Sequence, residues 1–359
     1  MQRRYYFRNP YKGGYNYDYL KKVFDSCSRP SRQEIENYKE NPANKVSNTQ
    51  YAAFDDKTFG IADIYPKDIP HYYELLKLIY RYEKEEQKHV HKGNLFYFLL
   101  EEHLKMNQIE EGLLFINKAF MEDDFKHKDT TIKFPDSPAY KFIVLNAANP
   151  NQALFTIVKE IVDFMENAFM NDLGYSYNQF WSEFLNEASN KPDIEEAHKW
   201  LDQVIFFNSF IVRLKNIYRM PPEIFDSVFG EIMLSTIIGD LCLLTESFCK
   251  VKLRINGNIS EIYYNSNDPN TGVKKLYNWT GKSVTSSDFQ GNSLEGTLIN
   301  IFSNQYNSTD SIQNSFYLTW GLRNNFHHNI ESMAIIKENF REIIKKQLEF
   351  FFDFAIRLI

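Results

Sequence analysis

Apolar residues recur at spacings of three and four along most of the chain from His71 onward, and this periodicity is the strongest restriction on the fold. Such spacing gives an α-helix one apolar side. The pattern is clear at Tyr72, Leu75, Leu76, Ile79 and Tyr80. Glycine and proline are scarce, with 14 and 12 among 359 residues, which favours helices over sheets and turns. The sequence therefore predicts an all-α fold.

Three regions are predicted along the chain. Residues 1–70 are rich in tyrosine, asparagine and lysine and contain several prolines, which predicts an irregular, aromatic-rich arm. A short helix near residues 19–24 and an extended strand near residues 58–64 are expected within it. Residues 71–220 are predicted to form a helical sensor or interaction module. A double proline then marks the predicted start of the third region, residues 221–359.

The second region opens with a predicted helix–turn–helix. Its length is similar to that of one tetratricopeptide repeat, but no second copy follows in register, so an ordinary antiparallel helix pair is the other interpretation. Residues 121–128 are predicted to form a charged loop. Ser137 and Pro138 are typical first residues of a helix. Further helices are expected at residues 139–148, 151–170, 177–188 and 194–218.

One stretch of the second region allows a different fold and role. Residues 142–145 are also compatible with a strand that leads into a ligand loop at residues 146–151. In that alternative, residues 139–170 form a nucleotide-sensing module that switches on the third region.

The histidines and cysteines do not predict a metal site. His89 and His91 are close in sequence, but no acidic or cysteine residue stands at a spacing typical of zinc ligands. We therefore interpret this stretch as the solvated end of a helix. Cys242 and Cys249 lie seven residues apart and share one helix face, which predicts buried thiols. Neither a metal nor a cofactor is expected.

The third region is predicted to be a helical bundle with a polar insert. A long apolar helix is expected at residues 225–248, with Asp240 and Glu246 as its acidic exceptions. Residues 254–292 are polar and rich in asparagine and glycine, which predicts the insert. Helices are then expected at residues 291–302, 311–320 and 331–359.

The stretch before the last helix combines a guanidinium, an amide and imidazoles within six residues. Arg323, Asn324 and His328 form the pattern R-N-x-x-x-H. Imidazole titrates near neutral pH and suits general acid or base catalysis. A guanidinium binds two phosphate oxygens at once and keeps its charge. These residue types suit RNA cleavage by the 2′-OH of the substrate, which needs proton transfer and positive charge but no metal.

This pattern resembles the motif of the HEPN superfamily, all-α domains many of which are metal-independent ribonucleases. The resemblance covers residues 225–359, and in the family the motif lies at the start of the penultimate or final long helix. It implies a HEPN-like endoribonuclease with Arg323, Asn324 and His328 as catalytic residues. It also implies RNA as substrate, 2′,3′-cyclic phosphate products and a role in antiviral defence or a toxin system.

Three residues are candidates for auxiliary roles. His327 lies four residues from Arg323, the helical spacing that brings two side chains together. Asp240 and Glu246, on the long apolar helix, are expected to orient the histidine.

The resemblance also implies partners. Family members usually pair two domains so that both motifs face one cleft, so a chain with one motif is expected to form a homodimer with a composite active site. The apolar helix at residues 225–248 and the Phe-rich end at residues 348–356 are the expected faces. An antitoxin or an activator is a further expected partner.

Charge and hydropathy suggest where the chain acts. A net charge of −6 argues against nonspecific coating of nucleic acid. We recognise no signal peptide and no apolar run of membrane-spanning length, so no membrane contact and a cytoplasmic location are expected.

The alternative is a protein of a different class. It would be a catalytically inactive helical binding or adaptor protein, or a ligand-regulated HEPN effector. In the inactive case, Arg323 and His328 cap helices and bind acidic neighbours.

Overall fold

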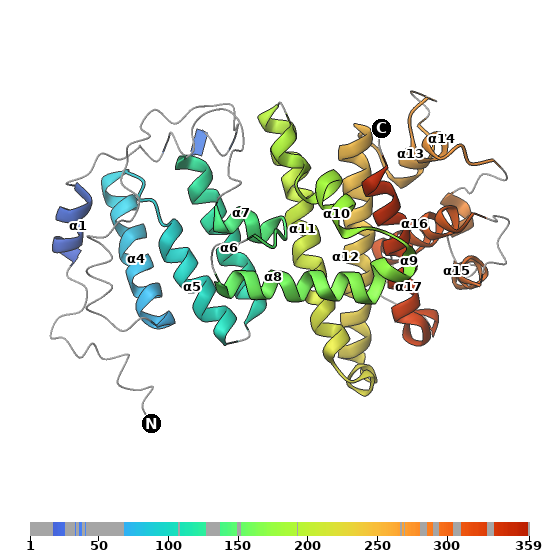
Figure 1. Cartoon of the computed structure of the whole chain (residues 1–359), viewed down its shortest axis with the longest axis horizontal. Helices are drawn as coiled ribbons and strands as arrows, with labels where there is room; N and C mark the ends of the chain where they lie inside the picture. Colours follow the sequence, from blue (N-terminus) through green and yellow to red (C-terminus); the bar gives the residue numbers. More distant parts are fainter. Residues whose placement is uncertain are drawn as a thin grey trace. The chain divides into compact units, whose positions relative to one another are not determined.

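A computed structural model gives the fold of the chain (Figure 1). It describes residues 17–25, 33, 36–37, 40, 68–106, 108–126, 137–148, 152–191, 193–265, 268, 270–280, 286–289, 294–303, 310–328 and 334–357. The regular elements in this part of the chain are helices, without a β-strand, which confirms the all-α prediction. The strand expected near residues 58–64 lies outside the described residues.

The chain forms two compact units. Unit 1 comprises Met1–Val158 and Ala188–His198, and unit 2 comprises Lys159–Glu187 and Lys199–Ile359. The double proline at positions 221 and 222 lies inside unit 2, where it separates two long helices.

Unit 1 is built from helices that follow one another along the chain. They are α1 (Tyr17–Asp25), α4 (Ile69–Glu86), α5 (Gly93–Lys105), α6 (Ile109–Lys126) and α7 (Pro138–Ile143). α4 begins where Asp68 Oδ1 accepts a hydrogen bond from the backbone N–H of His71. α4, α5 and α6 lie side by side (Figure 1), and α6 approaches α5 closely at Gly112, where a Cβ atom would lie 2.9 Å from Leu104 Cδ2.

Two predictions in unit 1 are wrong. α6 continues to Lys126, although a loop was expected from residue 121. Its acidic residues Glu122 and Asp123 bind polar groups inside the unit, so their charge does not interrupt the helix. Phe142 belongs to α7 and is buried, so the strand at residues 142–145 is also wrong. The predicted helix start at Ser137 and Pro138 is confirmed.

Among the described residues, the longest helices lie wholly or mainly in unit 2. The elements from residue 152 onward are α8 (Gln152–Met165), η2 (Glu166–Met170), α9 (Asn171–Leu173), α10 (Tyr177–Phe180), η3 (Trp181–Leu185), η4 (Glu187–Asn190), α11 (Ile194–Arg219), η5 (Pro222–Phe225), α12 (Val228–Leu253), α13 (Ile259–Tyr263), α14 (Val273–Leu276), η6 (Ser286–Phe289), α15 (Leu294–Phe302), α16 (Ser311–His328) and α17 (Ala334–Ile356). α8, η4 and α11 contain the points where the chain passes between the units. α12, α16 and α17 pack on one another, and α15 packs on α16.

Phenylalanine rings fill the centre of unit 2. The ring centroid of Phe351 in α17 lies 5.4 Å from those of Phe184 and Phe207 and 5.5 Å from that of Phe248. Phe351 and its neighbours Phe350, Phe352 and Phe354 are fully buried. The prediction that this Phe-rich end is a dimer face is therefore wrong, because the rings are already covered within one chain.

α12 is long and apolar enough to cross a membrane when judged by length and composition alone. The expectation that no apolar run reaches that length is therefore wrong. A core helix meets the same criterion, and Ile238, Leu241 and Leu244 of α12 are buried in unit 2.

α16 extends through the R-N-x-x-x-H pattern instead of ending before it. The predicted end near residue 320 is wrong, since the helix continues to His328. Gly321 does not terminate the helix. It is buried where α15 crosses, and a Cβ atom there would lie 2.6 Å from Leu298 Cδ2 and 3.0 Å from Phe289 Cδ1. The pattern therefore occupies the last turns of the penultimate long helix, whereas the family places it at a helix start.

Candidate active site

Arg323 is bound to Glu246 of α12 at the end of α16. Arg323 Nε donates to Glu246 Oε2 at 2.6 Å, and Nη2 lies 3.4 Å from Oε1. Lys250, one turn further along α12, lies 2.8 Å from Oε1 of the same carboxylate. Glu246 is 6% exposed and Arg323 18% exposed, so the pair is partly removed from water. Such fork-shaped contacts fix the plane of a guanidinium.

The environment of Glu246 favours its charged form. Burial alone would raise the pKa of Glu246, but hydrogen bonds from Lys250 and Arg323 outweigh burial and hold the pKa below its usual value. The carboxylate is therefore ionised at neutral pH. Both described hydrogen bonds of Arg323 use Nε and Nη2, and Nη1 donates to no acceptor among the described residues.

The remaining residues of the pattern differ in their surroundings. Asn324 is half-buried. Asn325, which the sequence pattern does not single out, is 4% exposed, and its Nδ2 atom has no acceptor in the described part of the chain. The side chains of His327 and His328 lie outside the described residues, although their backbone belongs to α16.

Helical geometry separates the two histidine positions. At 3.6 residues per turn, position 327 lies about 40° around the helix from Arg323, whereas position 328 lies about 140° away. Because α16 is helical up to residue 328, position 327 shares the face of Arg323 and position 328 does not.

Of the two acidic candidates, only Glu246 contacts the pattern among the described residues. Asp240 instead binds Arg213 of α11, whose Nη1 atom lies 2.7 Å from Asp240 Oδ2. Glu246 binds the arginine, and its expected role in orienting a histidine stays a prediction.

The two cysteines are buried as predicted. Cys242 lies one turn before Glu246, and Gln347 Nε2 of α17 donates to its Sγ atom at 3.0 Å. Burial raises the pKa of Cys242 to about 12 and also raises that of Cys249. Both thiols are therefore protonated and unreactive at neutral pH.

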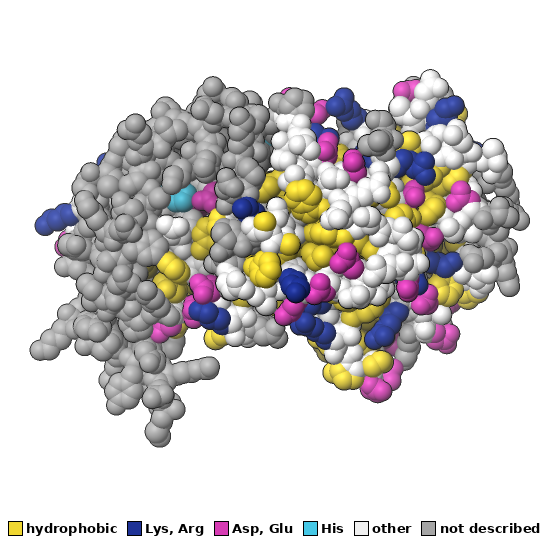
Figure 2. Space-filling view, viewed as in Figure 1, with side chains coloured by type: hydrophobic (Ala, Val, Ile, Leu, Met, Phe, Trp, Pro, Cys, Tyr) yellow, Lys and Arg dark blue, Asp and Glu magenta, His cyan; other side chains and the backbone are white. Residues whose placement is uncertain are grey.

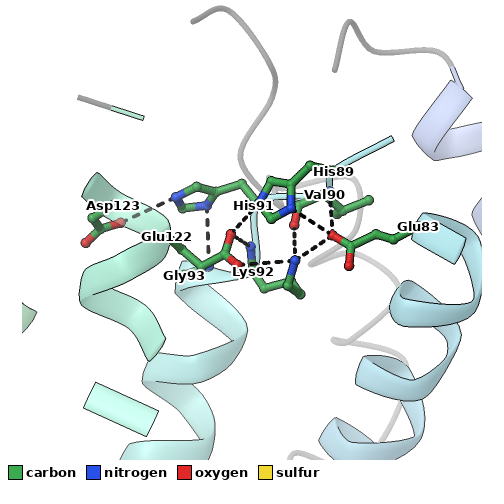
Figure 3. Close-up of polar contacts among 8 residues, drawn as sticks. All are labelled: Glu83, His89, Val90, His91, Lys92, Gly93, Glu122 and Asp123. Atoms are coloured by element: carbon green, nitrogen blue, oxygen red, sulfur yellow. Dashed lines mark hydrogen bonds and ion pairs between the residues drawn. The ribbon is translucent and has the colours of Figure 1, made fainter. Parts of the chain in front are cut away.

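A second polar cluster, in unit 1, was not predicted from the sequence (Figure 3). Lys92 is 3% exposed, and its Nζ atom lies 2.6 Å from Glu83 Oε1 and 3.2 Å from Glu122 Oε1. His89 bridges the same two carboxylates, with Nδ1 3.1 Å from Glu83 and Nε2 2.9 Å from Glu122. Lys92 also donates to the carbonyl of Val90 at 2.7 Å. This cluster joins α4, the start of α5 and α6.

The interpretation of His89 and His91 as a solvated helix end is therefore wrong. His89 is 6% and His91 2% exposed, and His91 Nε2 lies 3.5 Å from Asp123 Oδ1. Glu83 is 6 positions from His89 in sequence, whereas Glu122 and Asp123 are more than 30 positions from the histidines that they contact. No local sequence pattern could therefore indicate these pairs. Within the described part of the chain, no group of three or more His, Cys, Asp or Glu side chains is arranged to hold a metal ion.

Charges in this cluster stabilise one another. Burial alone would raise the pKa of Glu83, but hydrogen bonding to His89 and the charge of Lys92 lower it below its usual value. Burial alone would lower the pKa of Lys92, but the negative charges of Glu122 and Glu83 outweigh burial and raise it above its usual value. The cluster thus carries its charges in a buried and well hydrogen-bonded arrangement, which suits a structural role.

No protein-family model, curated protein or solved structure matches this chain significantly.

Proposed function

We propose that unit 2 is a metal-independent endoribonuclease of the HEPN type. The observation that supports it is the pair between Arg323 and Glu246. It fixes a permanent positive charge on a helix end that also carries a half-buried amide and two histidines. Nη1 of Arg323, which has no acceptor among the described residues, is the kind of donor that a phosphate oxygen requires.

In this proposal, RNA supplies its own nucleophile. His328 acts as a general base that removes the proton of the 2′-OH, and the 2′-oxygen attacks the adjacent phosphorus. The bond to the 5′-oxygen then breaks, and that oxygen takes a proton from a second histidine. Arg323 stabilises the added charge on the phosphorane, and Asn324 orients one of these groups. The products are a 2′,3′-cyclic phosphate and a 5′-OH end.

The helix geometry favours a homodimer in this mechanism. A single regular helix does not direct positions 323 and 328 to one side, whereas two copies of α16 can supply the arginine and the histidine from different chains. α12 offers a face for this contact, because Leu243 is 52% exposed and lies one turn from Glu246. An antitoxin or an activator, a role in defence or toxicity and a cytoplasmic location belong to the same proposal.

The test is cleavage of labelled total RNA in EDTA by the full chain and its variants. Wild type is compared with Arg323→Ala, His328→Ala and His327→Ala. Arg213→Ala is the matched control, because Arg213 is also a half-buried arginine of unit 2 bound to a carboxylate at 2.7 Å. We expect Arg323→Ala and His328→Ala to lose at least about 100-fold in rate, with Arg213→Ala retaining activity.

The histidine variants decide between the two positions. If His327→Ala loses RNA cleavage and His328→Ala keeps it, the acid–base residue is His327, the position that shares the face of Arg323. Equal activity in all five proteins would indicate a contaminating nuclease. It would leave the helical binding protein as the better proposal, with Arg323 and Glu246 as a structural ion pair.

A further inference from the structure

A pocket of about 540 Å³ lies in unit 2 where α11 ends and α12 begins. The end of α11, η5, α12 and the first turns of α17 line it, and Tyr218, Phe225, Leu234 and Phe340 supply apolar surface. η5 is held against α12 at Gly230, where a Cβ atom would collide with the backbone of Phe225. This close packing holds η5, one part of the pocket wall, against the start of α12.

Apolar side chains beside this pocket are unusually exposed. Ile224 is 53% exposed, Val228 73%, Phe229 86% and Ile232 45%. They belong to η5 and the first turns of α12, the same elements that line the pocket. We call these four residues and the pocket the α12 tip. Figure 2 shows hydrophobic side chains beside Asp and Glu at the turn from α11 to α12. Contiguous exposed apolar surface marks interaction sites.

The rim of the pocket is acidic. Glu223 and Asp226 flank it near η5, and Glu338 and Glu342 flank it on α17, all with exposed side chains. Arg341 also lines the pocket, but its guanidinium lies over the ring of Tyr218, 5.0 Å from the centroid. Among the described residues that line the pocket, four carboxylates against one guanidinium give a negative rim around an apolar floor. A ligand with both apolar and cationic groups complements such a surface.

A second copy of the chain fits this surface less well. In a symmetric pair through the α12 tip, the acidic rims of both copies would face each other, and like charges across an interface are unfavourable. The four exposed side chains offer roughly a few hundred Å², below the ~800 Å² per partner of a standard stable interface. A short segment of a different protein needs less area and brings the opposite charge.

We propose that the α12 tip binds a short segment of another protein in which aromatic or aliphatic side chains alternate with lysine or arginine. The apolar side chains enter the pocket and cover Phe229, and the cations reach the carboxylates of the rim. The proposal is independent of any ribonuclease activity, since it uses none of the residues assigned to catalysis.

The probe is a fluorescent synthetic peptide in which leucine or phenylalanine alternates with lysine. Its counterpart carries glutamate at every lysine position. Binding to the full chain is measured by fluorescence anisotropy at low and at physiological salt. We expect the lysine peptide to bind at least ~10-fold more tightly than the glutamate peptide, and its affinity to fall with salt.

Two variants locate the site, each with a matched control. Phe229→Ser is paired with Leu114→Ser, which removes a 55% exposed leucine of α6 in unit 1. The second variant replaces three rim carboxylates (Glu223→Gln, Glu338→Gln, Glu342→Gln). Its control removes three carboxylates of unit 1 (Glu74→Gln, Glu110→Gln, Glu111→Gln) and so matches the charge change. Both tip variants should lose ~10-fold or more in affinity, and both controls should bind like wild type.

Several outcomes would overturn the proposal. Equal binding of both peptides, or equal loss in the tip variants and their controls, would mean nonspecific attraction to an acidic protein. A wild-type dimer in sedimentation that Phe229→Ser dissociates, together with no peptide binding, would make a second copy the occupant. Circular dichroism of each variant separates lost binding from lost folding, and exposed positions are chosen so that all variants fold.

Discussion

Arg323 Nε lies 2.6 Å from Oε2 of Glu246, a carboxylate that Lys250 also binds from within α12. This pair connects the end of α16 to the longest apolar helix of unit 2. It also places the positive charge of the R-N-x-x-x-H pattern in a defined orientation. Stability and the proposed chemistry of the site therefore depend on the same two residues.

Replacing Glu246 with glutamine should destabilise unit 2 by about 2–4 kcal/mol, because Arg323 loses its ionised partner in a partly buried setting. The matched control is Asp240→Asn, which breaks the more exposed pair with Arg213 and should cost less than about 1 kcal/mol. The stability of both variants is measured by unfolding in urea, with hydrogen exchange of peptides from α16 as the readout. If both variants lost the same free energy of unfolding, the burial of Glu246 would not explain the destabilisation.

Lys92→Met should destabilise unit 1 by about 3–5 kcal/mol, because it leaves Glu83 and Glu122 as buried charges without their lysine. Lys105 is the matched control, since it also contacts two glutamates, at 3.2 and 2.8 Å, but is 56% exposed. Lys105→Met should change stability by less than about 1 kcal/mol. The measurement is hydrogen exchange of α5 under increasing urea. A small effect of Lys92→Met would mean that the carboxylates find water or become protonated.

Unit 1 should lose stability as the pH rises above neutrality. Burial alone would lower the pKa of His89, but the charge of Glu122 and hydrogen bonds to Glu122 and Glu83 raise it above its usual value. A raised pKa means that protonated His89 stabilises the fold. This stabilisation is complete below the unfolded pKa of about 6.5 and disappears as the pH passes the folded pKa.

His89→Gln is the variant that tests this dependence. Opening of α5 and α6 is followed by hydrogen exchange at several pH values, with rates corrected for intrinsic exchange. The wild type should open more readily at alkaline pH, whereas His89→Gln should be less stable at about pH 6 and nearly independent of pH. The same slope in both proteins would exclude His89 as the titrating group.

Phe351→Ala should cost about 3–5 kcal/mol in unit 2, because Phe351 is fully buried against several other rings. Phe229→Ala removes the same side chain from an 86% exposed position and should leave stability within about 0.5 kcal/mol of wild type. Thermal unfolding of the two variants compares them directly. A large loss in Phe229→Ala would mean that the α12 tip is covered in solution.

Substitution by alanine should change the free energy of unfolding in opposite directions at two helical glycines. At Gly296 of α15 nothing lies within 4 Å of the position that a Cβ atom would take, so Gly296→Ala should stabilise the chain by about 0.5–1 kcal/mol through helix propensity. At Gly321 the new methyl group would press on Leu298 and Phe289, so Gly321→Ala should destabilise by about 1 kcal/mol or more. Chemical unfolding distinguishes them, and a stabilised Gly321→Ala would show that α15 can shift.

Local sequence signals predicted many helices well. Ser137 and Pro138 start a helix, and apolar periodicity located α11 to within one residue and the start of α12 to within three. These features depend on side chains three or four positions apart, which the sequence displays directly. The helix predicted at residues 311–320 ended eight residues too early, because the packing of α15 against Gly321 depends on the tertiary structure.

The sequence by itself determined the all-α class, the apolar faces of the long helices and the residues of the R-N-x-x-x-H pattern. Only the tertiary structure decided which charges meet. It paired Glu246 with Arg323 and Asp240 with Arg213, and it buried Lys92 between Glu83 and Glu122. Helix periodicity is a local property of the chain, whereas an ion pair between residues 77 positions apart depends on how whole helices pack.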